Sequence, residues 1–416
     1  MDNFYEQVRD RFIRYSKVDT QSCRNSETAP STMKQKVLGE MLRDELIEIG
    51  VQNVSMSNEC CVYGTIPANI KASACKSIGF IAHMDTSPDA PSADIKPWVL
   101  MNYQGGDILL NKKENIVMEE AKYPNLKNYI GKDLILSDGT TLLGGDDKAA
   151  ISAIMTMAEY FCKHPEIPHG PIQIGFTPDE EVGRGTENFD IKRFGAELAY
   201  TLDGDAVGII NYETFNAGEA VLTIHGLNVH PGTAKNIMKN AVEIGSRFIE
   251  MLPELERPHN TELREGYYHP DEFQGTVEKA TLHCLIRDHS MVRFNERKTY
   301  IKKCVEKLNQ IYGEGTVELS YRDSYYSMEE PVRKVFFMVD YLNEAIEACG
   351  VTPSAVAFRG GTDGSWLSQK GLPCPNLSAG YENAHGRFEY VPIQSMEKNV
   401  DILIKLVGIF AKESEK

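Results

Sequence analysis

Short apolar runs, each followed within three residues by an acidic or imidazole residue, constrain the fold of this chain more than any other feature. The runs Ile78–Ala82, Ile172–Phe176 and Leu198–Leu202 have the length and composition of buried strands. Between the first two lies Ala149–His164, an apolar stretch without a polar stripe and with the length of a buried helix. Because buried strands alternate with a buried helix, we expect an α/β fold whose sheet contains parallel strands.

The pattern changes after about Phe215. The segments that follow are predicted in alternation as strands and amphipathic helices: 219–225, 234–252, 276–286, 293–312 and 316–321. This order predicts an α+β unit with an antiparallel sheet. Long helices resume at 331–349 and 395–411, whereas residues 86–140 are predicted as loops and hairpins. We therefore expect a catalytic domain in two parts, 1–213 and 329–416, interrupted by an inserted domain at 214–328.

The length and composition are those of a globular protein with more than one domain. At 416 residues, with 42% hydrophobic and 25% charged residues, the chain can bury a large core. No apolar stretch reaches the about 18 residues that a membrane span needs, and the acidic N-terminus lacks the basic and apolar regions of a signal peptide. We therefore expect a cytoplasmic protein with no membrane partner.

Charge and cysteine content argue against further classes of protein. The formal net charge is −16 and no basic patch is evident, so nucleic acid is not expected as a partner. The nine cysteines are scattered, with no Cys-x-x-Cys spacing. This spacing favours free thiols in a reducing compartment and argues against a zinc site built on thiolates.

The first candidate site residues end the run Ile78–Ala82. His83 and Asp85 are two residues apart, so their side chains leave the same face of an extended segment. Asp85 could bind a metal beside His83, or it could accept the imidazole N–H and thereby set the tautomer. The competing interpretation is a surface turn, because Thr86-Ser-Pro-Asp-Ala is a turn sequence.

A pair of acids, Asp146 and Asp147, follows two glycines and precedes the apolar helix. One acid of the pair can cap the N-terminus of that helix, which is the simpler interpretation of the pair by itself. Two adjacent acids do not point the same way in ordinary backbone geometry. We therefore expect one to be a metal ligand and the other to serve the helix or a neighbour.

Three consecutive acids, Asp179, Glu180 and Glu181, lie just past the run that ends at Phe176, after Thr177 and Pro178. A cation or a shared proton would relieve their mutual repulsion and the cost of burying their charge. One glutamate can then bind metal, while the other takes a proton from water and passes it to a leaving group. A solvated loop is the alternative interpretation.

Two more candidates lie far apart in the sequence. Asp203 ends the run Leu198–Leu202 and His385 lies in a loop rich in Gly and Asn, and neither alone would indicate a site. With one acid taken from each cluster, the candidates form a set of ligands that divalent zinc, cobalt or manganese accepts: His83, Asp146, Glu181, Asp203 and His385. Five protein ligands exceed one tetrahedral zinc, so two ions that share a bridging carboxylate fit the set better.

Longer phrases around these residues resemble the M20 metallopeptidases. The matching phrases follow the family's order through nearly the whole chain: Ile81-Ala-His-Met-Asp-Thr-Ser-Pro-Asp89, Leu143-Gly-Gly-Asp-Asp-Lys-Ala149, Phe176-Thr-Pro-Asp-Glu-Glu-Val-Gly183, Asn228-Val-His-Pro-Gly-Thr-Ala-Lys235, Arg359-Gly-Gly-Thr-Asp-Gly364 and Gly371-Leu-Pro-Cys-Pro-Asn376. The set is specific, although single phrases are not. The resemblance implies a two-domain α/β protein: a zinc-peptidase-like catalytic domain, with a mixed sheet flanked by helices, and an inserted α+β lid and dimerisation domain.

The resemblance also implies a role for each matched residue. The implied ligands of two Zn²⁺ ions (or of cobalt or manganese) are a bridging Asp146, His83 and Asp203 on one ion, and Glu181 and His385 on the other. Asp85 would orient His83, and Glu180 would be the general base and acid. These assignments choose within the acidic clusters, where spacing alone leaves the choice open. The family often has a cis peptide bond after the bridging aspartate, so a cis Asp146–Asp147 bond is expected.

Two further matches lie in the expected inserted domain. His230 resembles a histidine that stabilises the tetrahedral oxyanion, and in dimers of related enzymes it reaches the site of the other subunit. Arg287 resembles an arginine suited to hold a substrate carboxylate through two hydrogen bonds. Without the resemblance, a turn histidine and a surface ion pair would be the simpler interpretations. Two positions depart from the family pattern, Asp205 in place of a glycine and Ala384 in place of a bulky aromatic residue, and neither removes a ligand.

Together these inferences predict a metal-dependent aminopeptidase that releases the N-terminal residue from tripeptides. Water held between the two ions would give its proton to Glu180 and attack the first peptide carbonyl. The partners expected are short peptides and, from the resemblance, a second copy of the chain bound through the inserted domain. A dipeptidase or an N-acyl amino acid deacylase on the same dinuclear site is the alternative. A metal-free binding protein is the alternative from another class, and the intact ligand set argues against it.

Overall fold

A computed structural model describes residues 3–71, 75–204 and 206–414, and it divides into two units. The main unit comprises Met1–Tyr212, Pro331–Val356 and Thr362–Lys416. The inserted unit comprises Glu213–Glu330 and the short segment Ala357–Gly361. The sequence division assigns this short segment to the catalytic part. In the structure it joins the inserted unit, because backbone hydrogen bonds link 358 to 213 and 360 to 215.

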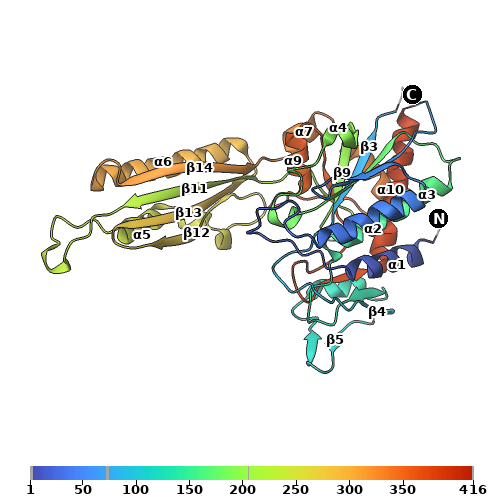
Figure 1. Cartoon of the computed structure of the whole chain (residues 1–416), viewed down its shortest axis with the longest axis horizontal. Helices are drawn as coiled ribbons and strands as arrows, with labels where there is room; N and C mark the ends of the chain where they lie inside the picture. The colour runs from blue at the N-terminus through green and yellow to red at the C-terminus, as the bar shows by residue number, and fades with distance from the viewer. Residues whose placement is uncertain (1–2, 72–74, 205, 415–416) are drawn as a thin grey trace. The chain divides into compact units, whose positions relative to one another are not determined.

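The main unit is built on a mixed sheet that has eight strands in the described residues (Figure 1). In spatial order the strands are β1 (Gln52–Met56), β2 (Val62–Ile66), β8 (Ile172–Thr177), β3 (Ile78–His83), β9 (Leu198–Leu202), β16 (Asn376–Leu377), β10 (Ile209–Asn211) and β15 (Ser354–Ala355). The neighbours β8, β3, β9 and β16 run parallel. The pairs β1–β2, β2–β8 and β10–β16 are antiparallel. The expected α/β class is thereby confirmed.

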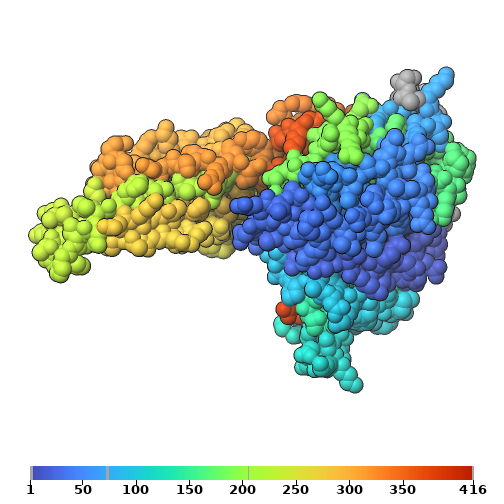
Figure 2. Space-filling view, in the orientation of Figure 1, coloured from blue at the N-terminus to red at the C-terminus, as the bar shows by residue number. Residues whose placement is uncertain are grey.

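Helices cover both faces of this sheet, which is why every residue of β3, β8 and β9 is buried. The helices are α1 (Tyr5–Ser16), α2 (Gln35–Glu48), α3 (Gly145–Lys163), α4 (Ile191–Phe194), α8 (Phe337–Ala348), α9 (Asp363–Gln369) and α10 (Ile393–Glu413). On one face Ile81 shares an apolar cluster with Phe194 of α4 and Leu367 of α9. On the other face the ring of Tyr200 contacts Phe410 of α10. The N-terminal residues, blue in Figure 2, form much of the main unit's surface in that view.

The stretch 86–140 contains short strands, as its composition indicates. The three-stranded sheet β17-β7-β4 joins β17 (Tyr390–Pro392), β7 (Leu134–Leu136) and β4 (Trp98–Leu100), and a hairpin joins β5 (Ile108–Asn111) to β6 (Ile116–Met118). The hairpin projects from the surface of the main unit (Figures 1 and 2). Pairing of β17 with β7 anchors this region beside the loop that carries His385.

The inserted unit is an antiparallel sheet covered on one face by two helices. Its elements are β11 (Asn216–His225), α5 (Ala241–Met251), β12 (Tyr267–Gly275), β13 (Lys279–Asp288), α6 (Met291–Tyr312) and β14 (Val317–Tyr325). The strand order is β12-β13-β11-β14. Alternate residues of β11 and β13, such as Leu222 and Leu282, meet Ile244, Phe248 and Ile301 of the helices in one core.

The elements in the structure differ from those expected from the sequence in three places. The helix predicted at 234–252 begins only at Ala241, because the Asn240 side chain caps it by accepting the N–H of Val242 and Ile237 is half exposed. Strand β12 was not predicted, since its polar residues and a proline hide the strand period. The helix predicted at 331–349 is divided into α7 (Glu329–Arg333) and α8.

Two global properties can be read from the described residues. No helix among them is both long and apolar enough to cross a membrane. All nine cysteines lie in described segments, and each is a free thiol in the structure.

Candidate active site

Three adjacent parallel strands deliver candidate residues to one edge of the main sheet. His83 is the last residue of β3, the acidic turn follows β8, and Asp203 follows β9. His83 is in register with Thr177 at the end of β8, so the segments after the two strands start side by side. Because the carboxyl ends of parallel strands share one edge of the sheet, residues far apart in sequence converge there.

Asp146 reaches the same place from the start of α3. Gly144 has φ +80°, and Asp146 and Asp147 have non-helical backbone angles, so the chain turns sharply before regular helix begins. The Asp146–Asp147 peptide bond is cis, as expected. The two carboxylates point to different neighbours. Asp146 Oδ1 lies 2.8 Å from His83 Nε2, whereas Asp147 Oδ2 accepts the backbone N–H of His83 at 3.2 Å.

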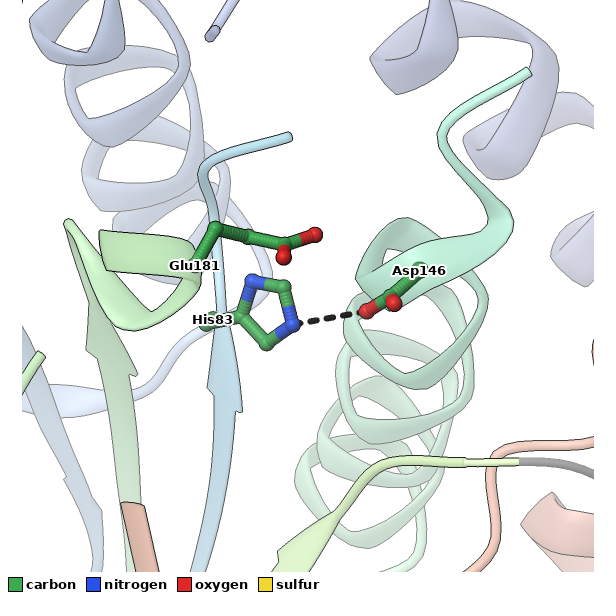
Figure 3. A group of neighbouring side chains, drawn as sticks. All are labelled: His83, Asp146 and Glu181. Carbon is green, nitrogen blue, oxygen red and sulfur yellow. Dashed lines mark hydrogen bonds and ion pairs between the residues drawn. The ribbon is translucent and has the colours of Figure 1, made fainter. Parts of the chain in front are cut away.

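Asp146 is the common member of the cluster. One of its oxygens faces His83, and the other lies 3.2 Å from His385 Nε2. His385 Nε2 also lies 2.9 Å from Glu181 Oε2. Figure 3 shows the side chains of His83 and Glu181 directed toward Asp146 at the N-terminal end of α3. The structure therefore brings four of the five predicted ligands into direct contact.

Asp203 completes the cluster on the side of Asp147. Ligand atoms of Asp146, Asp147 and Asp203 all lie within 4.8 Å of one another, as do those of His83, Asp146 and Glu181. The Tyr381 hydroxyl donates to Asp203 Oδ1 at 2.5 Å, and it accepts the backbone N–H of Gly204 at 2.7 Å. The next residue, Asp205, lies outside the described residues.

Asp85 links the histidine strand to the acidic turn. Its carboxylate accepts the backbone N–H of Glu180 at 2.9 Å and that of Glu181 at 3.2 Å. Asp85 Oδ1 also lies 3.4 Å from His83 Nδ1, while the closer partner of that nitrogen is the Asp85 backbone oxygen at 3.1 Å. Asp85 can thus orient the imidazole and the acidic turn together.

The pKa values in the cluster are shifted because several carboxylates are buried close to one another. Burial raises the pKa of Glu181 to about 8, and the charge of Asp146 adds to that rise. Burial, again helped by Asp146, raises the pKa of Asp203 to about 6. Hydrogen bonds to Asp146 and Glu181 raise the pKa of His385 to about 11. Burial also raises the pKa of Glu180 well above its usual value, although the nearby His83 opposes the rise.

These residues suit a divalent cation site. Glu181 Oε1 and Asp147 Oδ1 are buried and have no hydrogen-bond partner in the described part of the chain. A buried carboxylate oxygen without a partner is costly, and a cation would satisfy it. Imidazole nitrogens and carboxylate oxygens are the ligands that zinc, cobalt and manganese share. The donor set and the orphaned oxygen of Glu181 therefore fit a metal site.

His230 and Arg287 lie in the inserted unit. His230 is exposed in the segment between β11 and α5, and its Nδ1 accepts the backbone N–H of Gly232 at 3.1 Å. Arg287 is half-buried in β13 and donates from Nη1 to the backbone oxygens of Ile286 and Gly218, at 2.9 and 3.1 Å. Their roles in substrate binding stay predictions.

Sequence reasoning missed several residues that support the cluster. Asp179 accepts hydrogen bonds from the backbone N–H of Ser31 at 2.6 Å and from the Gln35 side chain at 2.6 Å, and so holds the acidic turn against α2. The Asp363 carboxylate accepts from the Thr177 hydroxyl at 2.6 Å. Asp363 carries no sequence signal beyond membership of a matched phrase, whereas Asp179 is also one of the three consecutive acids, a pattern that assigns it no role of its own. Tyr381, which donates to Asp203, lies outside those phrases and carries no such signal.

Comparison with known proteins gives close relatives along the full chain. The family model described as a peptidase dimerisation domain matches residues 212–316. A peptidase T from Caldanaerobacter subterraneus subsp. tengcongensis is 49% identical over 406 residues, which cover 98% of this chain and 99% of the relative. A peptidase T from Clostridium novyi is 49% identical over 407 residues, with 98% and 100% covered.

Solved structures share the fold at lower identity. An aminopeptidase from Bacillus cereus aligns with a TM-score of 0.77 and 23% identity, and a tripeptidase from Staphylococcus aureus with 0.77 and 21%; each alignment covers 98% of this chain and 99% of the other. A dinuclear metal-binding M20 peptidase from Bacillus subtilis aligns with a TM-score of 0.68 and 12% identity, covering 98% and 99%. On the strength of the near-half identity over almost its entire length, the chain belongs to the peptidase T family of M20 peptidases.

Proposed function

We propose that the chain is a two-metal aminopeptidase that cleaves the N-terminal residue from tripeptides. The observation that carries the proposal is the position of Asp146, whose two carboxylate oxygens face His83 and His385 respectively. A carboxylate presented in this way can bridge two ions. The family membership and the names of the close relatives, all of them peptidase T, support the substrate class.

The ligand assignment is the one that the family resemblance implies, and the central position of Asp146 supports its being shared. His83 and Asp203 would hold one ion and Glu181 and His385 the other, with Asp146 shared. Zinc is the metal we propose, and cobalt or manganese would accept the same ligands. Such ions, when bound, supply Lewis-acid polarisation of the peptide carbonyl and lower the pKa of water.

Glu180 is the proposed general base and acid. It is adjacent to a metal ligand, and the backbone contact with Asp85 fixes the turn from which its side chain extends. Burial raises the pKa of Glu180, which moves it toward the operating range of a group that must both take and give a proton. Glu180 would accept the proton of the attacking water and then donate it to the departing amine.

The inserted unit supplies the proposed substrate contacts. His230 would stabilise the oxyanion that develops on the carbonyl, and Arg287 would hold the carboxylate at the end of the tripeptide. The match to a peptidase dimerisation domain supports a homodimer formed through this unit. In such a dimer, His230 would serve the site of the other subunit.

A side-by-side assay tests the proposal. The metal-loaded full chain is given trialanine, dialanine and N-acetylalanine, before and after EDTA treatment and after return of Zn²⁺, Co²⁺ or Mn²⁺. The expected result is release of alanine from trialanine, loss of that activity with EDTA, and recovery with a divalent metal. Faster cleavage of dialanine or N-acetylalanine would instead identify a dipeptidase or a deacylase. Full activity in protein shown by metal analysis to be metal-free would overturn the metal-dependent mechanism.

A further inference from the structure

Glu389 is a buried carboxylate that the proposed reaction does not use. It lies four residues after His385, is only 2% exposed, and accepts three backbone N–H groups from the segment around the start of α3. One oxygen accepts from Leu143 at 2.8 Å and from Gly144 at 2.7 Å, and the other accepts from Asp146 at 2.8 Å. Glu389 therefore binds the backbone of the proposed bridging ligand directly.

The backbone around the start of α3 needs such an acceptor. Residues 144–147 do not follow a regular helical path, so their N–H groups lack the partners that a helix interior would give them. The acids in this segment are engaged elsewhere, Asp146 with the histidines and Asp147 with the backbone of His83. A carboxylate from another part of the chain takes the place of a helix cap.

The packing around this contact leaves little room for adjustment. A Cβ atom built on Gly145 would come within 2.7 Å of Val391 Cγ2, 2.9 Å of Glu389 Oε1 and 3.0 Å of Tyr381 Cβ. The segment that presents Asp146 is therefore pressed against the two ends of the loop that carries His385. Close packing of this kind transmits a shift on one side to the other.

The loop that carries His385 is itself closed on both sides of that residue. Glu382 and Tyr390 exchange backbone hydrogen bonds of 3.0 and 3.1 Å, and the Asn383 side chain donates to Phe388 O at 2.9 Å. Glu389 lies within this closed loop. The position of His385 is thus tied to Glu389, and Glu389 is tied to the backbone of Asp146.

We propose that Glu389 is a positioning residue that sets the spacing between Asp146 and His385, and through it the affinity of the site for metal. The inference rests on the proposed metal site and adds a residue that none of the proposed chemical steps requires. Residues that orient metal ligands typically change metal affinity by about 10–100-fold when they are replaced.

The test compares Glu389→Gln with a matched control, Asp133→Asn. Asp133 is also buried in the main unit and accepts three hydrogen bonds, from the N–H of Asn102 and the side chains of Tyr5 and Gln394. None of these partners is a proposed metal ligand. Both substitutions keep the shape of the side chain and replace one acceptor oxygen by a donor, so both lose comparable hydrogen bonds.

Two measurements separate positioning from general stability: the Zn²⁺ affinity by chelator competition, and the Tm of the metal-free and Zn²⁺-loaded full chain. For Glu389→Gln we expect about 10–100-fold weaker Zn²⁺ binding and a smaller rise of Tm on loading. For Asp133→Asn we expect a lower Tm with unchanged Zn²⁺ affinity. Glu389→Asp, which keeps the charge but not the reach, should bind Zn²⁺ with intermediate affinity.

The outcomes distinguish this inference from the proposed function. If the unmodified chain binds no Zn²⁺, the proposed metal site itself is wrong. If it binds Zn²⁺ and Glu389→Gln binds it equally well, with Tm lowered by the same amount in both forms, Glu389 is structural and the inference is overturned. Should Glu389→Gln fail to fold, Glu389→Asp decides: weaker binding supports the inference and unchanged binding overturns it.

Discussion

Two clusters of buried charge, one in each unit of the molecule, are balanced in different ways. In the inserted unit, the buried guanidinium of Arg297 lies over the ring of Tyr268 and is paired with Asp288 at 2.8 Å and with Glu256. In the main unit, six carboxylates surround two imidazoles at one edge of the sheet: Asp85, Asp146, Asp147, Glu180, Glu181 and Asp203 around His83 and His385. Within the described residues, no lysine or arginine forms an ion pair with these acids.

The buried charge around Arg297 stabilises the fold of the inserted unit, whereas the buried charge of the main-unit cluster suits the proposed chemistry. The inserted unit balances Arg297 with acids from its own fold, so the pairing is complete when the chain has folded. The main unit concentrates negative charge that only protons or cations can balance, and its perturbed pKa values follow from that imbalance. Substitutions in the main-unit cluster should therefore lower activity and leave stability unchanged. Substitutions in the inserted-unit cluster should lower stability instead.

The largest expected effect is on catalysis in the main unit. Glu180→Gln removes the proposed base while it keeps the size of the side chain. We expect turnover of trialanine to fall by about 10²–10⁴-fold, the usual contribution of general acid–base catalysis, with Zn²⁺ content and Tm unchanged. Steady-state kinetics, metal analysis and calorimetry on the same preparation measure all three.

A matched control is Glu187→Gln, which removes an exposed carboxylate from the segment after the acidic turn. Its turnover should stay near that of the unmodified chain. Near-normal turnover in Zn²⁺-loaded Glu180→Gln would show that another group moves the proton.

The second effect is on stability in the inserted unit. Arg297→Met leaves Asp288, which is 1% exposed, without its cationic partner. Removing one member of a buried pair typically costs about 3–5 kcal/mol of unfolding free energy. Denaturant unfolding should show that loss, while Zn²⁺ affinity stays unchanged.

Arg293→Met is the control for this substitution, because Arg293 is exposed on the same helix. Its expected effect is within about 0.5 kcal/mol. An Arg297→Met protein that unfolds like the unmodified chain would mean that the pair with Asp288 contributes no net stability. The buried charge of the inserted unit would then not serve stability as inferred.

The third effect is the pH dependence of metal binding. The pKa of His385 is raised to about 11 and that of Glu181 to about 8, so at pH 7 both hold protons in the metal-free protein. A metal ion must displace those protons, and its apparent affinity therefore rises with pH and falls as pH is lowered. Between pH 6 and 8 we expect about a tenfold rise per pH unit for each proton displaced.

Calorimetric titration with Zn²⁺ in two buffers of different ionisation enthalpy gives the number of protons released. A pH-independent affinity with no proton release would contradict the protonation that the crowded carboxylates impose. Arg297→Met should release the same number of protons as the unmodified chain, since the ion pairs of the inserted unit lie outside the proposed ligand set.

The ends of the parallel strands were predictable from sequence because the signal there is local. Ile78–Ala82 is apolar throughout and Ile172–Phe176 is apolar apart from Gln173, and titratable residues lie shortly after each run, so both the strand and its functional end can be recognised. The choice of Asp146 over Asp147 needed the family resemblance. In the structure the two acids differ in their partners, the imidazole of His83 for one and its backbone for the other, which no spacing rule contains.

Features that depend on distant partners escaped prediction. Glu389 is one acid in Arg-Phe-Glu-Tyr, and its task is visible only when the backbone of 143–146 is placed against it. The false helical start at 234 has the same origin. Ile237 continues the helical spacing of Ala241 and Phe248, but in the structure it is 52% exposed. Burial of its side chain therefore does little to stabilise a helix at that position.

The smallest effect concerns a hydroxyl group in each unit. Tyr381→Phe removes the hydrogen bond to Asp203 Oδ1 and leaves the N–H of Gly204 without its acceptor. Tyr321→Phe removes a comparable bond, 2.6 Å long, to Lys298 O in the inserted unit. Each lost side-chain hydrogen bond should cost about 0.5–1.5 kcal/mol of unfolding free energy, and the unpaired N–H of Gly204 should make Tyr381→Phe the less stable of the two variants. Only Tyr381→Phe should also weaken Zn²⁺ binding, by no more than about tenfold, because only its hydroxyl holds a proposed ligand. Equal Zn²⁺ affinities in the two variants would show that the Tyr381 hydroxyl does not hold Asp203 in a position that metal binding needs.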